Sequence, residues 1–443
     1  MDSPALSSSP VTDIEAALAA AHAAYQGRNP RSLAQVERAA RAMPGGNTRT
    51  VLHYPPFPLT MARGEGSRLW DLDGHAYVNL LGEYTAGIYG HSHPAILAAI
   101  RRALDAGLSL SGHNLVEEQL AHAIVERFPS IDLVRFTNSG TEANLMAVGL
   151  AKAFTGRSRV VAARGGYHGG AMTLSYPASP LNAPFPYVLV DYNDVDGAAE
   201  AIGEAADDVA AIIVEPMMGS GGCLPATPEF LAMLRAEATR IGAVLIFDEV
   251  MTSRLGPGGL QPLVGVQADI TTLGKYLGGG SSFGAFGGRA DIMALFDPRR
   301  ADALPHAGTF NNNVISMAAG LAGLTEVYTP AAAETLNARG DQLRVRLNEV
   351  CRARNAPMQF TGLGSLMNAH VTAAPIRRVA DIQAGDMKAR DLLFHHLLGE
   401  GLYTARRGFV ALSLAVEAED LDRYVDAVDG FLGTYGHLLA PAA

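Results

Sequence analysis

Short apolar runs alternate with helical segments from about residue 95 to residue 328, and this alternation limits the folds that the chain can adopt. Segments 142–154 and 229–240 have the length and composition of helices. The runs that we expect to be strands lie around and between them, at 133–136, 159–163, 211–214, 244–247 and 270–273. Such alternation is typical of a mostly parallel sheet covered by helices on both faces. The sequence therefore predicts an α/β protein.

The chain is long enough for more than one domain, because it has 443 residues and domains have roughly 150 residues each. Pro and Gly interrupt residues 43–66, and Thr329-Pro330 follows a predicted helix. A candidate hairpin, 69–80, contains Asp73-Gly74. We expect an N-terminal segment that packs with the small domain, a large α/β domain and a smaller α+β C-terminal domain, with the bounds 1–65, 66–328 and 329–443.

Composition argues against several classes of protein. The net charge is −10 and the longest basic runs are arginine doublets, so a nucleic-acid partner is not expected. No apolar run approaches the roughly 20 residues of a membrane span. Only two cysteines are present, and the first residues do not resemble a signal peptide. We expect a cytoplasmic protein that binds no membrane.

Within residues 95–328, two charged residues follow apolar runs that we expect to be strands. Asp248 lies in I-F-D-E-V at 246–250, and Lys275 ends T-T-L-G-K at 271–275. A solitary charge is costly to bury, so each needs a partner. Pyridoxal 5′-phosphate would need both, because a lysine binds it covalently and an acid keeps its pyridine nitrogen protonated. A structural salt bridge between Asp248 and Lys275 is the alternative.

A candidate phosphate site follows the strand at 133–136. Ser139, Gly140 and Thr141 lie where this strand gives way to a helix. The unpaired N–H groups and partial positive charge of a helix N-terminus suit a phosphate. An ordinary helix cap would need the same residue types. Both interpretations stay open at this point.

Three more residues lie after strand candidates. Tyr167, in the glycine-rich stretch 165–169, could stack on a cofactor ring or be a partly buried tyrosine. Glu215 could orient a group beside the cofactor, although a lone glutamate is usually solvated. Val250 could pack on the pyridine face or in the core. Because open α/β sheets bind ligands along the carboxyl edge of their strands, the shared placement of all these residues favours one site there.

These motifs together resemble the class III aminotransferases of the fold-type I pyridoxal-phosphate superfamily. The resemblance covers about residues 43–414 and is carried by N-S-G-T-E-A, G-Y-H-G, F-D-E-V, T-T-L-G-K and G-T-F, which begin at residues 138, 166, 247, 271 and 308. It implies a pyridoxal-phosphate enzyme that forms a homodimer with shared active sites. The glutamate-1-semialdehyde aminomutases of this family share F-D-E-V-M-T and G-A-F-G-G. They typically carry a Ser-Gly-Asn-Pro-like sequence after Gly-Thr, whereas this chain has N-N-N-V at 311–314.

Within the family, the chain is most similar to the aromatic β-amino acid (β-phenylalanine) aminotransferases. The similarity is carried by N-T-R-T-V-L, E-Y-T-A-G, G-T-F-N-N-N and R-G-F, which begin at residues 47, 83, 308 and 407. It implies that Lys275 is the catalytic lysine that binds the cofactor, that Asp248 is the partner of the pyridine nitrogen, and that Gly140 and Thr141 bind the phosphate. From their placement at strand ends, we expect Ser139, Tyr167, Glu215 and Val250 to bind the cofactor as well.

The same resemblance assigns three residues outside that set. Thr309 would reach the phosphate of the neighbouring subunit, and Arg49 and Arg407 would bind substrate carboxylates. Arg406 directly precedes Arg407, which leaves open which of the two arginines faces the site. No metal ion is expected.

The implied reaction is the reversible transfer of an amino group from a β-amino acid to a keto acid such as 2-oxoglutarate or pyruvate. The donor would be aromatic, like 3-amino-3-phenylpropanoate, and Lys275 would serve as general base and acid. An aminomutase-like isomerase is the alternative, and it would need no keto acid. A non-catalytic cofactor-binding protein is disfavoured by the presence of both Asp248 and Lys275. The preferred acceptor and the enantiomer stay open.

Overall fold

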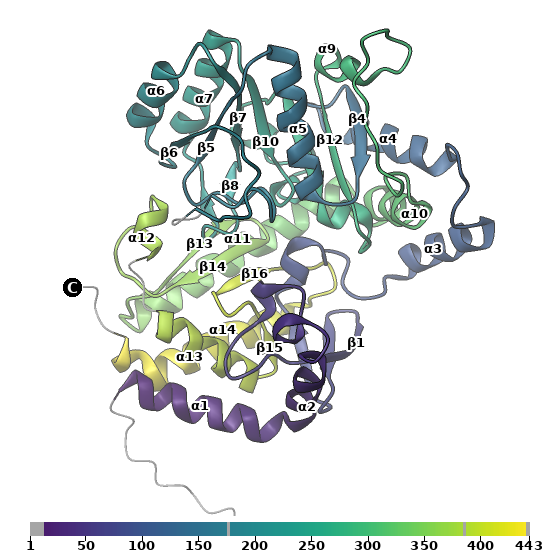
Figure 1. Cartoon of the computed structure of the whole chain (residues 1–443). Coiled ribbons are helices and arrows are strands. Elements are labelled where there is room, and N and C mark those ends of the chain that lie inside the picture. The colour runs from purple at the N-terminus through teal and green to yellow at the C-terminus, as the bar shows by residue number, and fades with distance from the viewer. Residues whose placement is uncertain (1–12, 175–177, 384–386, 440–443) are drawn as a thin grey trace, which may run out of the picture.

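The computed structural model describes residues 13–174, 178–383 and 387–439. The upper part of Figure 1 contains a seven-stranded sheet of order β4-β12-β11-β10-β7-β5-β6. Strand β12 is antiparallel to β11 and β4, and the other neighbouring strands pair in parallel. The bounds are β4 Leu133–Thr137, β5 Arg159–Ala163, β6 Tyr187–Val190, β7 Val209–Val214, β10 Val244–Asp248, β11 Ile270–Gly274 and β12 Gly284–Gly288. The predicted mostly parallel sheet is confirmed.

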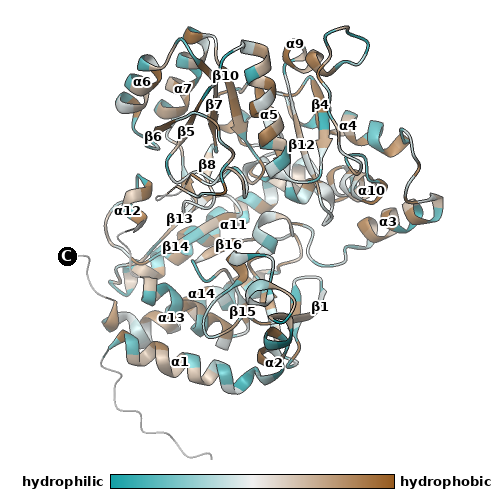
Figure 2. Ribbon diagram, in the orientation of Figure 1, coloured by the Kyte–Doolittle hydropathy of each residue, from teal (hydrophilic) through white to brown (hydrophobic). Residues whose placement is uncertain are grey.

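Both faces of this sheet are apolar, so helices can cover both. Val161 and Ala163 of β5 pack with residues of α6 (Val195–Glu204) and α7 (Pro228–Ile241). Val160 and Ala162, whose side chains point the other way, pack with residues of α5 (Gly140–Thr155). The central strands β7 and β10 are accordingly brown in Figure 2.

The predicted helices and strands of this part are present within a few residues of their expected ends. Helix α5 was expected at 142–154 and α7 at 229–240. Two strands of the sheet, β6 and β12, were not predicted. Helices α3 (Pro94–Ala106) and α4 (Leu115–Arg127) pack against α10 (Val314–Ala322), which continues as a π-helical turn, Gly323–Val327.

The lower part of Figure 1 contains the C-terminal helices and two smaller sheets. Sheet β13-β14-β16 is antiparallel, and helix α11 packs against β13. The predicted hairpin at 69–80 is present as β2 and β3, and β3 also pairs in parallel with β15. The bounds are β1 Met61–Glu65, β2 Arg68–Asp71, β3 Ala76–Asn79, β13 Gln359–Leu363, β14 Leu366–His370, β15 Leu402–Tyr403, β16 Phe409–Ala411, α1 Ile14–Arg28, α2 Pro30–Ala39, α11 Pro330–Ala353, α13 Met387–Gly399 and α14 Ala418–Tyr435.

The remaining short elements connect these parts. They are α8 Gln261–Val264, α9 Ala290–Met293, α12 Val379–Gln383, β8 Met217–Met218 and β9 Leu224–Pro225. The domain bounds 1–65, 66–328 and 329–443 stay a prediction, and the pairing of β3 with β15 joins residues on both sides of the second boundary. In the ranges that the structure describes, none of the helices has the length and apolar character needed to cross a bilayer.

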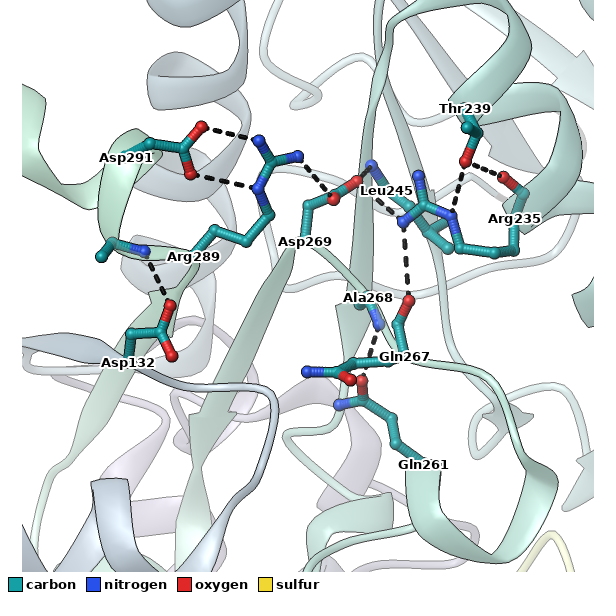
Figure 3. Close-up of polar contacts among 11 residues, drawn as sticks. Asp132, Arg235, Thr239, Leu245, Gln261, Gln267, Ala268, Asp269, Arg289 and Asp291 are labelled. Carbon is teal, nitrogen blue, oxygen red and sulfur yellow. Dashed lines mark hydrogen bonds and ion pairs between the residues drawn. The ribbon is translucent and has the colours of Figure 1, made fainter.

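A polar network around the buried carboxylate of Asp269 holds the sheet at the starts of β10 and β11. Figure 3 shows the Asp269 carboxylate between Arg235 and Arg289, which donate to it at 2.9 and 3.0 Å. The same carboxylate accepts a hydrogen bond from the backbone N–H of Leu245 at 2.8 Å. Because these contacts lie at the amino end of the strands, they fix the sheet at the edge opposite to the one on which the candidate site lies.

Candidate active site

A cavity of about 310 Å³ opens at the carboxyl edge of the seven-stranded sheet. Each of β4, β5, β7, β10 and β11 ends beside it, because parallel strands all end at the same edge. Its lining includes eight residues predicted from the sequence, namely Ser139, Gly140, Thr141, Tyr167, Glu215, Asp248, Val250 and Lys275. The structure therefore brings these eight together, while their individual roles stay predictions.

The N-terminus of α5 faces this cavity. Ser139 is the N-cap, and its hydroxyl accepts a hydrogen bond from the Glu142 N–H at 3.2 Å. Gly140 lies directly against Val250: a β-carbon at position 140 would be 2.9 Å from Val250 Cγ1. Only glycine therefore fits there. The helix cap and a candidate phosphate site coexist, because capping leaves other first-turn N–H groups unpaired.

Asp248 is buried within a network of hydrogen bonds. His168 Nδ1 donates to Asp248 Oδ2 at 2.8 Å, and Asn144 Nδ2 donates to the same oxygen at 2.7 Å. Thr272 donates to Asn144 Oδ1 at 2.6 Å, which fixes the orientation of the amide. Burial alone would lower the pKa of His168, but the hydrogen bond and the charge of Asp248 raise it. His168 and Asn144 therefore hold the Asp248 carboxylate in one orientation by hydrogen bonds.

Lys275 follows β11 and lies in the cavity wall with its backbone in the left-handed region, at φ 55°. Its Nζ donates to the carbonyl oxygen of Tyr84 at 2.9 Å. Residues 83–85 also have positive φ, so the segment that meets the lysine is strained as well. Burial, with smaller contributions from Arg407 and Arg49, lowers the pKa of Lys275 from 10.5 to about 8, although Asp248 opposes this shift.

The alternative of a structural salt bridge between Asp248 and Lys275 does not describe this geometry. Asp248 is paired with His168, and the amine of Lys275 is bonded to a neutral carbonyl. Asp248 and Lys275 therefore have different hydrogen-bond partners, and both line the cavity.

Glu215 connects two loops at the cavity. One carboxylate oxygen accepts the N–H of Tyr167 at 3.0 Å, and the other accepts the N–H of Gly219 at 3.0 Å. Burial raises the pKa of Glu215 despite these hydrogen bonds. Tyr167 is 45% exposed and lines the cavity, so a ligand can reach it.

Both predicted substrate arginines lie near the ring of Tyr84. The guanidinium carbon of Arg49 is 5.9 Å from the centre of the Tyr84 ring, and that of Arg407 is 5.4 Å from it. Arg49 also forms an ion pair with Glu83. Arg406 is engaged elsewhere: its Nη2 donates to the buried carboxylate of Asp391 at 2.7 Å. Arg407 therefore lines a cavity beside the site, whereas Arg406 is paired with a structural carboxylate.

Thr309 lies outside the cavity of its own chain. It is exposed and lines a separate cavity of about 370 Å³, together with Phe310 and residues 108–114. Thr309 therefore does not line the cavity of Lys275 in the same chain. Its predicted role needs a second subunit and stays a prediction.

The sequence did not single out Asn144, Thr272 or the carbonyl of Tyr84. Asn144 had a signal, since it is a polar residue one turn after Gly140 on the buried face of α5. Thr272 had a weaker one as a hydroxyl inside a buried strand. The contact of Lys275 with the Tyr84 carbonyl could not be predicted from residue type, because every residue has a backbone carbonyl.

The polar groups of this cavity match the needs of pyridoxal 5′-phosphate. The first-turn N–H groups of α5 suit its phosphate, and the Asp248 carboxylate, held by His168, suits a protonated pyridine nitrogen. Lys275 provides an amine whose lowered pKa favours covalent attachment.

Comparisons with known proteins identify the family of the chain. The family model of the class III aminotransferases matches residues 51–432. A β-phenylalanine transaminase from Variovorax paradoxus is 54% identical over 429 residues, which is 97% of this chain and 99% of that protein.

Solved structures extend the comparison. The crystal structure of the β-phenylalanine aminotransferase from Variovorax paradoxus has a TM-score of 0.96 to this chain at 54% identity and covers 97% of this chain and 100% of its own. A transaminase with bound pyridoxal phosphate has a TM-score of 0.85 at 33% identity, covering 93% and 99%. A glutamate-1-semialdehyde aminomutase from Pseudomonas aeruginosa has a TM-score of 0.88 at 24% identity, covering 95% and 98%, and shares the fold alone.

Proposed function

Because this chain belongs to the class III aminotransferases, we propose that it transfers the amino group of an aromatic β-amino acid to a keto acid. The products are the corresponding β-keto acid and the amino acid formed from the acceptor. The enzyme depends on pyridoxal 5′-phosphate and has the fold-type I architecture. The observation that supports the β-amino acid most directly is the pair of arginines beside Tyr84, on a chain 54% identical to a β-phenylalanine transaminase.

When bound, pyridoxal phosphate supplies an electron sink that stabilises negative charge on the carbon bearing the nitrogen. The chain's own residues would do the rest. Gly140 and Thr141 would hold the phosphate, and Asp248, fixed by His168 and Asn144, would keep the pyridine nitrogen protonated. Lys275 would hold the cofactor and then move a proton with its freed Nζ, whose lowered pKa suits a base near neutral pH.

The donor's carboxylate is the feature that separates β-amino acids from α-amino acids. In a β-amino acid the amine lies one carbon further from the carboxylate, so the carboxylate clamp must stand further from Lys275. A planar guanidinium can hold a carboxylate with two hydrogen bonds. We assign the donor carboxylate to Arg49 and the keto-acid carboxylate to Arg407. Both arginines are close enough to Lys275 for their charges to lower its pKa.

A spectroscopic titration tests the proposal. Adding 3-amino-3-phenylpropanoate to the cofactor-loaded enzyme should remove the absorbance of the lysine-bound cofactor, and a keto acid should restore it. α-Phenylalanine is the matched control, since it has the same groups with the amine one carbon nearer the carboxylate. Equal or faster conversion of α-phenylalanine would contradict the β-amino acid assignment and leave the aminotransferase assignment intact.

The aminomutase alternative predicts a different requirement. An isomerase moves the amino group within one molecule and therefore needs no keto-acid acceptor. Turnover of an amino-aldehyde without any keto acid would support it.

We also propose a homodimer in which each subunit completes the other's site. Beside Thr309, the surface exposes Leu108, Leu110, Leu115 and Phe310, each at least 50% accessible in the single chain. An apolar patch of this kind indicates a protein interface, and a second copy is the partner that the role of Thr309 requires.

For location we propose the cytoplasm, because Cys223 and Cys351 are free and buried thiols.

A further inference from the structure

Arg254 is a fully buried arginine that does not line the cavity of Lys275. It ends the short 3₁₀ turn Thr252–Arg254, which follows β10 and its last residue, Asp248. Burial lowers the pKa of Arg254 to about 10, and the groups that oppose this shift are neutral tyrosines. A buried charge among neutral groups is costly unless its hydrogen bonds are made, so the contacts of this guanidinium need an explanation.

The guanidinium of Arg254 donates to residues that are distant in the sequence. Nε donates to the Ser365 hydroxyl at 3.2 Å, and Nη1 donates to the Thr85 carbonyl at 3.3 Å. Nη2 donates to the carbonyl of Leu412. Ser365 precedes β14 and Leu412 follows β16, so one planar side chain joins the small antiparallel sheet to the turn at residues 83–85.

The backbone of Arg254 is itself fixed. Its carbonyl accepts hydrogen bonds from the Tyr328 hydroxyl and from Asn337 Nδ2, the latter at 2.8 Å. Asn337 Oδ1 also accepts the backbone N–H of Ser365 at 2.9 Å. An arginine that is held at its backbone and at two of its side-chain acceptors restrains the turn 83–85 instead of following it.

The turn that Arg254 contacts is strained and carries the acceptor of Lys275. Glu83, Tyr84 and Thr85 have φ angles of 50°, 50° and 84°. Such conformations persist only where surrounding contacts fix them. The Thr85 carbonyl, which Arg254 contacts, directly follows the Tyr84 carbonyl, which accepts a hydrogen bond from Lys275 Nζ at 2.9 Å. The position of the Tyr84 carbonyl therefore depends on Arg254.

The Tyr84 side chain has separate support. Its ring stacks on Phe409, with the ring centres 5.8 Å apart and the planes at 16°. The chain before the turn is also joined to the end of β16, because the Ala411 N–H donates to the Leu80 carbonyl at 2.8 Å. Loosening Arg254 should therefore displace the Tyr84 carbonyl while the ring and the surrounding fold stay in place.

We propose that Arg254 is a positioning residue of the active site. Through the Thr85 carbonyl it fixes the turn 83–85, and this turn places the Tyr84 carbonyl on the amine of Lys275. The amine is thereby held in one orientation when it is not bound to the cofactor, which is the state in which it moves a proton. The inference rests on the proposed function for this proton transfer, whereas the contacts of Arg254 do not depend on the substrate.

Arg254→Lys tests this role, because it keeps the charge and loses the planar group that spans Thr85 and Leu412. Cofactor-loaded enzyme is mixed with saturating 3-amino-3-phenylpropanoate in a stopped-flow instrument. The rate constant for loss of the lysine-bound absorbance should fall about tenfold, as expected for a misplaced reacting group. The half-saturating donor concentration should stay unchanged, because the Tyr84 ring keeps its place. A purely structural defect would lower the amplitude, which reports the folded sites, and leave the rate constant unchanged.

A second readout needs no substrate. In the cofactor-free protein, the hydrogen bond to the Tyr84 carbonyl favours the charged form of the Lys275 amine. In Arg254→Lys, the rate of covalent cofactor loading should therefore level off at a pH about half a unit lower than in the native protein. The charged groups that act on the pKa of Lys275 are unchanged in this variant, namely Asp248, Arg407, Glu215 and Arg49.

Arg157→Lys is the matched control. Arg157 Nη1 also donates to backbone carbonyls, those of Ile241 at 2.6 Å and Val209 at 3.2 Å, but Val209 begins β7 at the amino edge of the sheet. This control should leave the rate constant and the loading profile unchanged. Equal effects of the two substitutions, or a native rate constant in Arg254→Lys, would overturn the proposal.

Ser365→Ala decides the question if Arg254→Lys does not fold, because it removes only the acceptor of Arg254 Nε. It should change the rate constant and the loading profile in the same directions by smaller amounts, and native values of both would overturn the proposal. A shifted loading profile in an enzyme that does not convert 3-amino-3-phenylpropanoate would reject the proposed donor and keep the role of Arg254.

Discussion

Lys275 is one of only three lysines in the chain, which makes its chemistry separable from that of Lys152 and Lys388. Burial lowers its pKa to about 8, so a substantial fraction of the amine is neutral at mildly alkaline pH. The rate of covalent loading of the cofactor-free protein should therefore rise with pH and level off above about 8. An ordinary lysine would show no plateau in this range.

Borohydride trapping checks the assignment directly. It should fix the cofactor to Lys275 in the native protein, and Lys275→Ala should trap none while still binding some cofactor through the phosphate and pyridine contacts. A trapped peptide that contains Lys152 or Lys388 would refute the assignment.

If Arg49 binds the donor carboxylate as proposed, substitutions of Arg49 and Glu83 should have opposite effects on the donor, because Glu83 forms an ion pair with the same guanidinium. Arg49→Ala should remove about 2–4 kcal/mol of binding and raise KM for the β-amino acid by about one to three orders of magnitude. Glu83→Gln should lower this KM by up to about fivefold, since an exposed ion pair contributes at most about 1 kcal/mol. Amines without a carboxylate should respond weakly to both substitutions in steady-state assays.

The turn before β16 is connected to α13 through Arg406 and Asp391. Asp391 is buried, and Arg406 is partly exposed. Arg406→Ala should lower the free energy of unfolding by about 1–3 kcal/mol in urea titrations, because it leaves a buried carboxylate without its partner. The double variant Arg406→Ala/Asp391→Ala should recover part of this loss. Additive effects in that cycle would show that the pair contributes nothing through mutual contact.

Strands with strong apolar patterns could be predicted, and those fixed by packing could not. Residues 209–214 are apolar throughout and form a strand buried on both faces. β12 is G-A-F-G-G, a sequence with weak strand preference. It is a strand because it pairs with β11 and β4 on its two sides, and this close pairing requires glycine: a β-carbon on Gly284 would be 2.1 Å from the Ser139 carbonyl oxygen, and one on Gly288 would be 2.1 Å from that of Asp269.

The same division applies to the candidate site. Lys275, Asp248 and the start of α5 were recognisable because charged or hydroxyl residues follow apolar strands. The contact of Lys275 with the Tyr84 carbonyl joins residues 191 positions apart and depends on three successive positive φ angles. No pattern in the sequence specifies that backbone.

The proposed dimer can be tested by mixing two inactive variants. Lys275→Ala removes the catalytic amine, and Thr309→Glu should repel the phosphate bound by the partner. If each site takes Lys275 from one subunit and Thr309 from the other, a mixed dimer has one site with both defects and one intact site. Co-refolded mixtures should then regain up to about a quarter of native activity, because half of the dimers are mixed and each has one working site. Mixtures that stay inactive although mixed dimers form would argue against shared sites.

Helix α5 contributes to both ends of the cofactor cavity, with Gly140 at its first turn and Asn144 one turn further along. One helical turn rises about 5.4 Å, and each added residue rotates the rest of the helix by about 100°. One rigid turn of α5, rather than a flexible loop, therefore sets the distance between the proposed phosphate site at Gly140 and the contact of Asn144 with Asp248. Insertions in the loops around the cavity are tolerable in principle, whereas a single residue added between Gly140 and Asn144 would turn the amide away from Asp248. To accommodate bulkier substrates, residues can be inserted in the loops around the cavity but not in this turn of α5.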